Sequence, residues 1–166
     1  MVSAPEPLTP KHDVSDFQCG KPALDHWLKN RALRNQQKGF TVVMAACAGN
    51  RVVGYYGVAP TAVVPHVLPR RIRTGQPPDP VPCLLLGQLA VDRRYAGHGI
   101  GNGLLRHALN RCLNAASMIG GRAVLVNAVD EEAARCWQRR GFMASREDAF
   151  VLFRSIADIA ASFSNP

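Results

Sequence analysis

The sequence predicts a mixed α/β fold in which helices flank a single central β-sheet. The run 85–91 is almost wholly apolar, as is typical of a strand buried on both faces, and an amphipathic helical pattern follows it at 104–113. Upstream, two β-rich runs at 41–47 and 52–64 are joined by the hairpin signal Ala48-Gly49-Asn50-Arg51. Glycines within the second of these runs indicate a bulge or a close backbone approach.

Local signals complete the order of elements. Pro22 suits the first turn of a helix, where its missing N–H costs no hydrogen bond, and an apolar face follows at Trp27 and Leu28. Asp130 can cap a later helix, and Gly141 stands just past the end of that helix. The expected elements are a helix from Pro22, strands at 41–47, 52–64 and 85–91, a helix at 101–118, a strand at 123–126, a helix at 131–140, a closing hairpin at 142–153 and a short terminal helix at 155–162.

Length and charge bound the class of protein. With 166 residues the chain is expected to form one domain, 1–166, with residues 1–10 as a flexible tail. The formal charge is +8 although only 19% of the residues are charged. This excess of Lys and Arg suits a phosphate-rich partner such as RNA or an acidic cofactor, and solubility alone is the alternative.

Cysteine usage and hydropathy indicate the compartment. The five cysteines are scattered and odd in number, and they form no Cys-x-x-Cys pair, which is typical of reduced thiols and predicts no metal site. No apolar run approaches the ~20 residues of a membrane span, and the start has no signal-like segment. We therefore expect a soluble, cytoplasmic protein with no membrane partner.

A segment rich in proline and arginine, residues 65–82, interrupts the strand pattern and is expected to be a loop within the domain. Arg70, Arg71 and Arg73 lie between its prolines and are candidates for binding a phosphate backbone. A solvated charged loop is an equally open interpretation.

Four glycines, Gly97, Gly99, Gly101 and Gly103, join the strand at 85–91 to the following helix. Glycines at such a junction let backbone N–H groups converge at the positive end of the helix dipole, an arrangement that suits a pyrophosphate. The spacing matches neither a P-loop, which needs a Lys after its last glycine, nor the dinucleotide fingerprint Gly-x-Gly-x-x-Gly.

The same loop resembles the acetyl-coenzyme A loop of the GCN5-related N-acetyltransferases (the GNAT family), Gln/Arg-x-x-Gly-x-Gly/Ala, with Ala96 in the first slot and Gly99 and Gly101 in the glycine slots. Within this family the chain looks like the toxins of type II toxin–antitoxin pairs that acetylate aminoacyl-tRNA. The stretches that carry this likeness are Phe17-x-Cys19-Gly20-x-x-x-Leu24-Asp25-x-Trp27-Leu28, Val53-Gly54-Tyr55-Tyr56, Leu86-Gly87-x-Leu89-Ala90-Val91-Asp92 and Gly141-Phe142.

The resemblance implies a GNAT fold in which acetyl-CoA lies in a splay between the fourth and fifth strands, here 86–92 and 124–128. It also implies that backbone near Leu89 or Ala90 donates to the thioester carbonyl as a local oxyanion hole. The residues implied to bind acetyl-CoA are Leu89, Ala90, Val91, Ala96, Gly97, His98, Gly99, Ile100, Gly101, Asn102 and Asn127. The implied partners are an aminoacyl-tRNA, a ribbon-helix-helix antitoxin and a second copy of the chain in a homodimer. The residues expected to contact the tRNA are Arg93 and Arg94 together with Arg70, Arg71 and Arg73.

Two positions depart from the family pattern. Toxins of this kind usually carry Phe-Tyr-x-x-x-Gly-Phe, whose Tyr is held to protonate the departing thiolate, whereas this catalytic slot is Trp137 here. Gln88 also stands where the family tends to have Arg. An indole N–H donates a hydrogen bond but delivers no proton near neutral pH. Tyr95, Cys136 or a water at 126–128 could supply the proton instead.

Acetyl transfer without any acid is a further option, because an α-amine with a pKa of about 7.7–8.0 is already partly unprotonated at neutral pH. Two other functions stay open. One is acetyl transfer to a protein or small-molecule amine. The other is a weakly active or inactive acetyl-CoA-binding regulator that acts with its antitoxin.

Overall fold

The computed structural model describes residues 1–164, and the chain divides into two compact units. The first unit comprises Met1–Ala59 and Gly87–Ala108, and the second comprises Pro60–Leu86 and the chain from Leu109 onward. Each unit therefore combines segments that are distant in the sequence.

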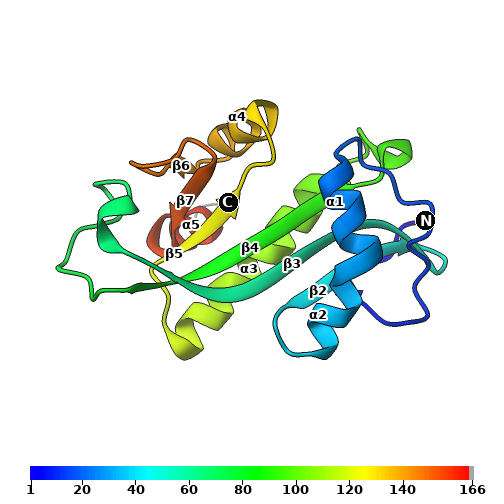
Figure 1. The fold of residues 1–166 in the computed structure, drawn as a ribbon, viewed down its shortest axis with the longest axis horizontal. Helices are drawn as coiled ribbons and strands as arrows, with labels where there is room; N and C mark the ends of the chain where they lie inside the picture. The colour runs from blue at the N-terminus through cyan, green and yellow to red at the C-terminus, as the bar shows by residue number, and fades with distance from the viewer. Residues whose placement is uncertain (165–166) are drawn as a thin grey trace. The chain divides into compact units, whose positions relative to one another are not determined.

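Strands β3 (Arg51–Val63) and β4 (Val81–Val91) and helix α3 (Ile100–Ile119) contribute residues to both units (Figure 1). In the first unit the strand order is β1-β2-β3-β4, with β1 (Glu6–Pro7) at the edge and β2 (Val42–Ala48) next to it. The β1/β2 and β2/β3 pairs are antiparallel, and a bulge lies between Ala46 and Cys47. The predicted hairpin of β2 and β3 is thus confirmed.

The amino-terminal segment corrects the expectation of a flexible tail at residues 1–10. Glu6 and Pro7 pair with β2, and the backbone N–H groups of Ser3 and Leu8 donate to Cys47 and Val43 oxygens at 2.8 and 2.9 Å. Backbone groups at the edge of β2 need hydrogen-bond partners, and this segment supplies them although its own sequence has little strand pattern. The segment is an edge strand.

The predicted helix from Pro22 is confirmed as a continuous helical segment. It consists of α1 (Pro22–Trp27), a π-helical turn (Leu28–Ala32) and α2 (Leu33–Gln37). Trp27 stacks on Tyr55 of β3, with ring centroids 5.9 Å apart. The core beneath this segment comprises Leu8, Phe17, Leu28, Ala32, Val43, Ala45, Cys47, Val52, Tyr55 and Ala90.

In the second unit the strand order is β3-β4-β5-β7-β6, which makes the sheet mixed. Leu84–Leu86 of β4 pair in parallel with β5 (Ala123–Asn127). Strand β5 pairs antiparallel with β7 (Val151–Ser155), and β7 pairs with β6 (Met143–Ala144). Together with the first unit, this pattern confirms the predicted α/β class and the closing hairpin.

Two helices complete the second unit, α4 (Glu131–Arg139) and α5 (Ile156–Ser164), which lie close to their predicted bounds. The Asp130 side chain accepts from the Ala133 N–H at 2.8 Å, as expected of an N-cap. Among the helices of residues 1–164, none combines the length and the apolar character needed to span a bilayer.

The segment 65–82 is less of a loop than the sequence predicts. It opens with a 3-10 turn (Pro65–Val67), and its last residues, from Val81, already belong to β4. Leu68 and Ile72 are fully buried, in a core shared with Val81, Cys83, Ala123, Leu125 and Phe153. Two apolar side chains therefore anchor this segment, while Arg70 and Arg71 lie exposed on the loop between the 3-10 turn and β4.

Helix α3 approaches β3 closely at Gly54. A Cβ built there would lie 2.8 Å from Leu104 Cδ1 and 3.3 Å from Ile100 Cγ2, and Leu104 is almost fully buried. The absence of a side chain at Gly54 therefore sets how near the first turns of α3 lie to the sheet, which confirms the close backbone approach predicted for this strand.

We expect Gly54→Ala to lower the free energy of unfolding by about 1–3 kcal/mol, because the added methyl overpacks a buried contact. Gly103→Ala is the matched control, since a Cβ at Gly103 meets nothing within 4 Å. In a helix this control should be neutral or stabilising by up to about 1 kcal/mol. Urea denaturation measures both, and equal stabilities for the two variants would contradict the close contact.

Candidate functional site

The glycine loop leads from β4 into the amino-terminus of α3. Gly97 and Gly99 both adopt φ of 79°, a conformation that favours glycine. A Cβ at either position would meet nothing within 4 Å, so glycine is required by the backbone conformation and not by a lack of space. Helix α3 begins immediately afterwards, at Ile100, and its first turn, Ile100-Gly101-Asn102-Gly103, has no acidic side chain. The positive end of this helix is therefore suited to an anion.

The other predicted residues of the loop are on the surface. Ala96 and His98 are exposed, and the His98 ring Nδ1–H donates to the Tyr95 carbonyl at 3.1 Å. Backbone N–H groups of Gly103 and Ala96 donate to Gly99 and Arg93 oxygens, at 3.0 and 3.3 Å. These hydrogen bonds, both within the loop and the start of α3, stabilise the loop conformation.

A buried carboxylate fixes the start of the loop. Asp92 is fully buried, and its oxygens accept from Arg94 N, Nε and Nη2 at 2.9, 3.0 and 2.8 Å and from Gln18 N at 3.2 Å. The hydrogen bonds from Arg94 are the main reason that the pKa of Asp92 falls to about 2. Its own backbone N–H donates to Val53 O at 2.8 Å. Asp92 thus ties the loop to β3 and to the segment before α1.

The predicted tRNA-binding arginines have different surroundings. Arg94 forms ion pairs with Asp92, at 2.8 Å, and with Asp16, at 3.4 Å. The exposed Arg93 guanidinium instead donates to Gln18 Oε1 at 2.5 Å. In the second unit Arg71 pairs with Asp158 at 3.2 Å, Arg70 is exposed and Arg73 is half-buried. Arg93 and Arg94 are therefore adjacent in the sequence but not equivalent.

The implied binding strand retains accessible surface where the loop begins. Leu89 and Val91 are half-buried, and Ala90 is buried. In the part of the chain that the structure describes, the last pair between β4 and β5 is Leu86 with Val126. Strand β4 itself continues to Val91, beyond this last pair. Asn127 is exposed and pairs through its backbone with Val151.

Trp137 lies near the end of α4, where it packs against Phe142. The two rings meet edge to face, with centroids 5.0 Å apart, and the Trp137 carbonyl accepts from the Phe142 N–H at 3.2 Å. Gly141, with φ of 91°, makes the turn between them, and a Cβ there would lie 3.1 Å from Arg154 Nε. The half-buried indole is therefore held by the helix end and by one aromatic neighbour.

The tyrosines offer few alternative acids. Tyr55 is buried, burial raises its pKa, and its hydroxyl donates to Leu24 O at 2.7 Å. The Tyr56 hydroxyl is also buried and lies 2.7 Å from His107 Nδ1. The Tyr95 hydroxyl accepts from Arg51 Nη2 at 3.1 Å and keeps its own proton to donate. Of the three tyrosines, Tyr95 is the least buried.

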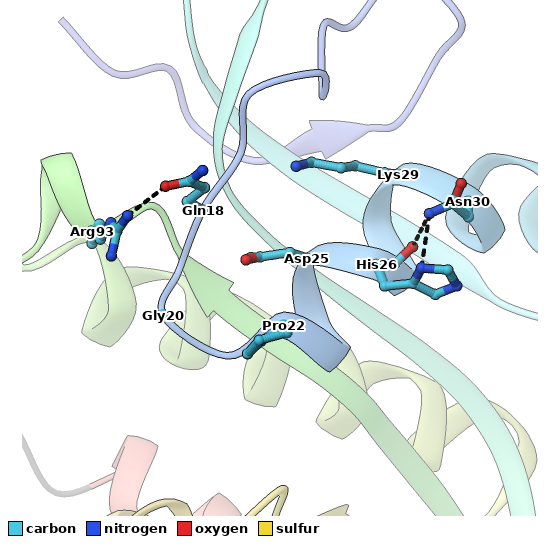
Figure 2. A pocket seen from close by; sticks show the side chains of 8 residues that line it. All are labelled: Gln18, Gly20, Pro22, Asp25, His26, Lys29, Asn30 and Arg93. Atoms are coloured by element: carbon cyan, nitrogen blue, oxygen red, sulfur yellow. Dashed lines mark hydrogen bonds between the residues drawn. The ribbon is translucent and has the colours of Figure 1, made fainter.

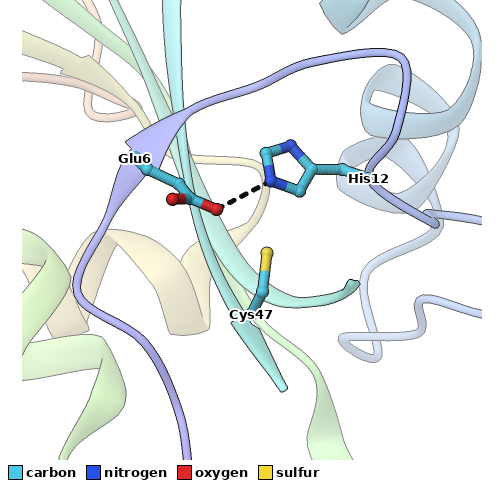
Figure 3. Close-up of side chains that lie close together, drawn as sticks. All are labelled: Glu6, His12 and Cys47. Atoms are coloured by element: carbon cyan, nitrogen blue, oxygen red, sulfur yellow. Dashed lines mark hydrogen bonds and ion pairs between the residues drawn. The ribbon is translucent and has the colours of Figure 1, made fainter. Parts of the chain in front are cut away.

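Glu6, His12 and Cys47 come close enough to resemble a metal site, with ligand atoms within 4.8 Å of one another (Figure 3). Thr9 N–H donates to His12 Nδ1 at 2.9 Å, so the ring proton is on Nε2, which donates to Glu6 Oε1 at 2.9 Å. Burial raises the pKa of the Cys47 thiol. The imidazole has no lone pair directed at the cluster and the sulfur keeps its proton, so these residues do not fit a metal ion.

One groove was not predicted from the sequence. It is lined by Gln18, Gly20, Pro22, Asp25, His26, Lys29, Asn30 and Arg93, all from the first unit (Figure 2). Among these residues, Arg93 alone was a predicted site residue. The motif around Phe17 and Asp25 was the one sequence signal near this groove, but it gave no indication of a cavity.

Comparison with known proteins identifies the class. The family model described as "Acetyltransferase (GNAT) family" matches residues 8–142, and the chain belongs to this family. It is 41% identical over 159 residues to a tRNA-acetylating toxin of Mycobacterium tuberculosis (strain ATCC 25618 / H37Rv), covering 96% of this chain and 95% of that protein.

Two solved structures extend the likeness. AtaT complexed with acetyl-methionyl-tRNAfMet has a TM-score of 0.88 and 26% sequence identity, covering 98% of this chain and 99% of that one. A Tyr-to-Phe mutant of AtaT, bound to the C-terminus of the antitoxin AtaR and acetyl-CoA, has a TM-score of 0.83 and 26% identity, covering 99% of both chains. The likeness therefore extends over essentially the whole chain.

Asp92 should make stability depend on pH. Its pKa in the folded protein, about 2, is below the ordinary 3.8, so the ionised form stabilises the fold above about pH 4, and this contribution is lost as the pH falls towards about 2. We expect Asp92→Asn to lower the free energy of unfolding at neutral pH by about 2 kcal/mol, and the difference from the parent to shrink over that range.

Asp16→Asn is the matched control, because Asp16 contacts the same guanidinium at 3.4 Å but is half exposed. It should cost less than about 1 kcal/mol. Urea titrations at several pH values measure both variants. A constant difference between parent and Asp92→Asn from neutral pH to about pH 2 would show that the Asp92 carboxylate is not the group that titrates.

Proposed function

We propose that this protein transfers an acetyl group from acetyl-CoA to the α-amine of an aminoacyl-tRNA, and that it thereby blocks translation as the toxin of a type II toxin–antitoxin pair. The observation that carries the proposal is the 41% identity, over nearly the whole of both chains, to a tRNA-acetylating toxin. The formal charge of +8 suits a tRNA substrate. Since charged tRNA is used in the cytoplasm, we place the activity there.

Acetyl-CoA supplies an activated acetyl thioester, and the chain supplies the surface that orients it. The backbone N–H groups of 97–102, at the amino-terminus of α3, would hold the pyrophosphate. Leu89–Val91 would pair with the pantetheine arm, and an N–H near Leu89 or Ala90 would donate to the thioester carbonyl. Ala96, His98 and Asn127 complete the proposed contacts. The AtaT complex with acetyl-CoA supports this assignment.

The chemistry needs positioning more than proton transfer. The neutral α-amine attacks the thioester carbon, a C–N bond forms, the C–S bond breaks, and coenzyme A departs as a thiolate. A thiol with a pKa of about 8.5 is a tolerable leaving group at neutral pH, and the amine, at about 7.7–8.0, is partly unprotonated before it binds. Trp137, which packs against Phe142, therefore supplies no proton, and solvent receives the proton of the amine.

The proposal includes a protein partner. The AtaT structure contains the C-terminus of the antitoxin AtaR, and we propose a corresponding antitoxin for this chain, of the ribbon-helix-helix type that the resemblance implies. A homodimer is the assembly that we propose for the toxin itself. An adjoining reading frame that encodes a small DNA-binding protein would supply the antitoxin.

Product analysis tests the activity. The protein is incubated with acetyl-CoA and total charged tRNA, the tRNA is digested with nuclease, and the aminoacyl-adenosines are identified by mass spectrometry. We expect an N-acetylated aminoacyl-adenosine that requires both substrates. Acetylation of protein or small amines alone would favour the second class of acetyltransferase. Bound acetyl-CoA without any transfer would favour a regulator.

Two substitutions at Trp137 test the role of the indole. We expect Trp137→Phe to keep the rate of acetyl transfer within about tenfold of the parent, since neither ring delivers a proton. Trp137→Tyr restores the family's acid, but because the proposed transfer needs no acid, its kcat should also stay within about tenfold of the parent. A rise of roughly 10²–10⁴-fold would show that protonation of the thiolate limits the parent. Abolished transfer in Trp137→Phe, with acetyl-CoA still bound, would show that the indole N–H is needed.

A further inference from the structure

The groove beside α1 presents two exposed cations, Lys29 and Arg93. It has a volume of about 510 Å³ and runs between the turn at 18–22, helix α1 and Arg93. In Figure 2 the charged ends of the two side chains reach towards the groove from opposite sides. Arg94, one residue further on, is held instead by Asp92 and Asp16. The groove therefore offers positive charge at two separate points.

The acidic group of the groove has a fixed position. Asp25 Oδ1 accepts from the Cys19 N–H at 2.9 Å, and in the view of Figure 2 its carboxylate lies between Arg93 and Lys29. A ligand with one central anion would meet this carboxylate directly and be repelled. A ligand that carries anions at intervals, with hydroxyl groups between them, would place an anion on each cation and a hydroxyl donor on Asp25.

An uncharged donor and an open backbone complete the surface. Gln18 accepts from Arg93 through Oε1, which leaves its amide NH₂ as a donor, whereas the Asn30 Nδ2 group already donates to the His26 carbonyl at 3.0 Å. Gly20 has φ of 92°, and a Cβ there would meet nothing within 4 Å, so the floor is accessible to a ligand. Spaced cations, one amide donor and one hydroxyl acceptor are the complement of a ribose–phosphate chain.

We propose that this groove binds the ribose–phosphate backbone of the tRNA, with Lys29 and Arg93 each contacting a phosphate and Asp25 accepting from a ribose 2′-hydroxyl. The assignment rests on the proposed function and adds residues to it. It favours RNA over an acidic peptide, because a peptide has no hydroxyl at each repeat to satisfy Asp25. It also separates Arg93, which binds RNA, from Arg94, which positions the glycine loop.

Binding of deacylated tRNA tests the groove without any chemistry. Fluorescence anisotropy with labelled tRNA at a series of salt concentrations gives Kd and the salt slope for the full-length protein and its variants. We expect Lys29→Gln and Arg93→Gln each to weaken binding about tenfold and to reduce the slope of log K against log salt by about 1. Lys38→Gln is the matched control, an exposed lysine that follows α2 outside the groove, and it should change neither quantity.

The outcomes separate the two proposals. If the parent acetylates charged tRNA and binds deacylated tRNA, but both groove variants bind as the parent does, the groove assignment is overturned and the activity stands. If the groove variants lose binding of a poly-glutamate peptide but keep tRNA binding, the groove is a peptide site and the RNA assignment is wrong. If the parent neither binds nor acetylates tRNA, the proposed function itself fails. Thermal denaturation of each variant confirms that it is folded.

Discussion

The contact between Gly54 of β3 and the first turns of α3 is the constraint on which the proposed site depends. Because Gly54 has no Cβ, the side chains of Leu104 and Ile100 pack directly against the backbone of β3, and this contact sets where α3 begins. At the other end of the loop, the buried Asp92 carboxylate fixes where β4 ends. Gly97 and Gly99 then make the short connection between the end of β4 and the start of α3. The position of the helix amino-terminus, and of any anion bound there, follows from these two contacts.

The two units carry different parts of the proposed chemistry. The first holds the glycine loop, the Asp92 anchor and the groove with Lys29 and Arg93. The second holds Trp137 and Asn127. In the first unit Asp92 and Arg94 position the glycine loop, and Lys29 and Arg93 are the proposed phosphate contacts. In the second unit the residue at the family's acid slot packs against Phe142. We therefore propose that positioning of two substrates is the main contribution of this chain, with an acid dispensable because the nucleophile is an α-amine.

Sequence patterns predicted the elements with strong periodicity or clear caps, which include β2 to β5, α3 and α4. They missed β1, because Glu6 and Pro7 are exposed and form a strand only by completing the edge of β2. They also missed the burial of Leu68 and Ile72, which is decided by distant partners in the core. Arg93 and Arg94 cannot be distinguished by sequence, since only the 3-10 turn directs one towards Asp92 and the other towards the groove. The groove itself combines residues 18–30 with Arg93, and no local pattern predicts such a combination.

Acid-free acetyl transfer is tested most directly by the pH dependence of kcat/KM with an aminoacyl-tRNA substrate. If the substrate amine is the only group that titrates, kcat/KM rises with pH, follows a single ionisation at or below about 7.7–8.0, and then stays level. A bell-shaped profile that falls again at higher pH in the parent protein would reveal an essential acid in the chain. Loss of that falling limb in Tyr95→Phe would identify the acid as Tyr95 and contradict the mechanism.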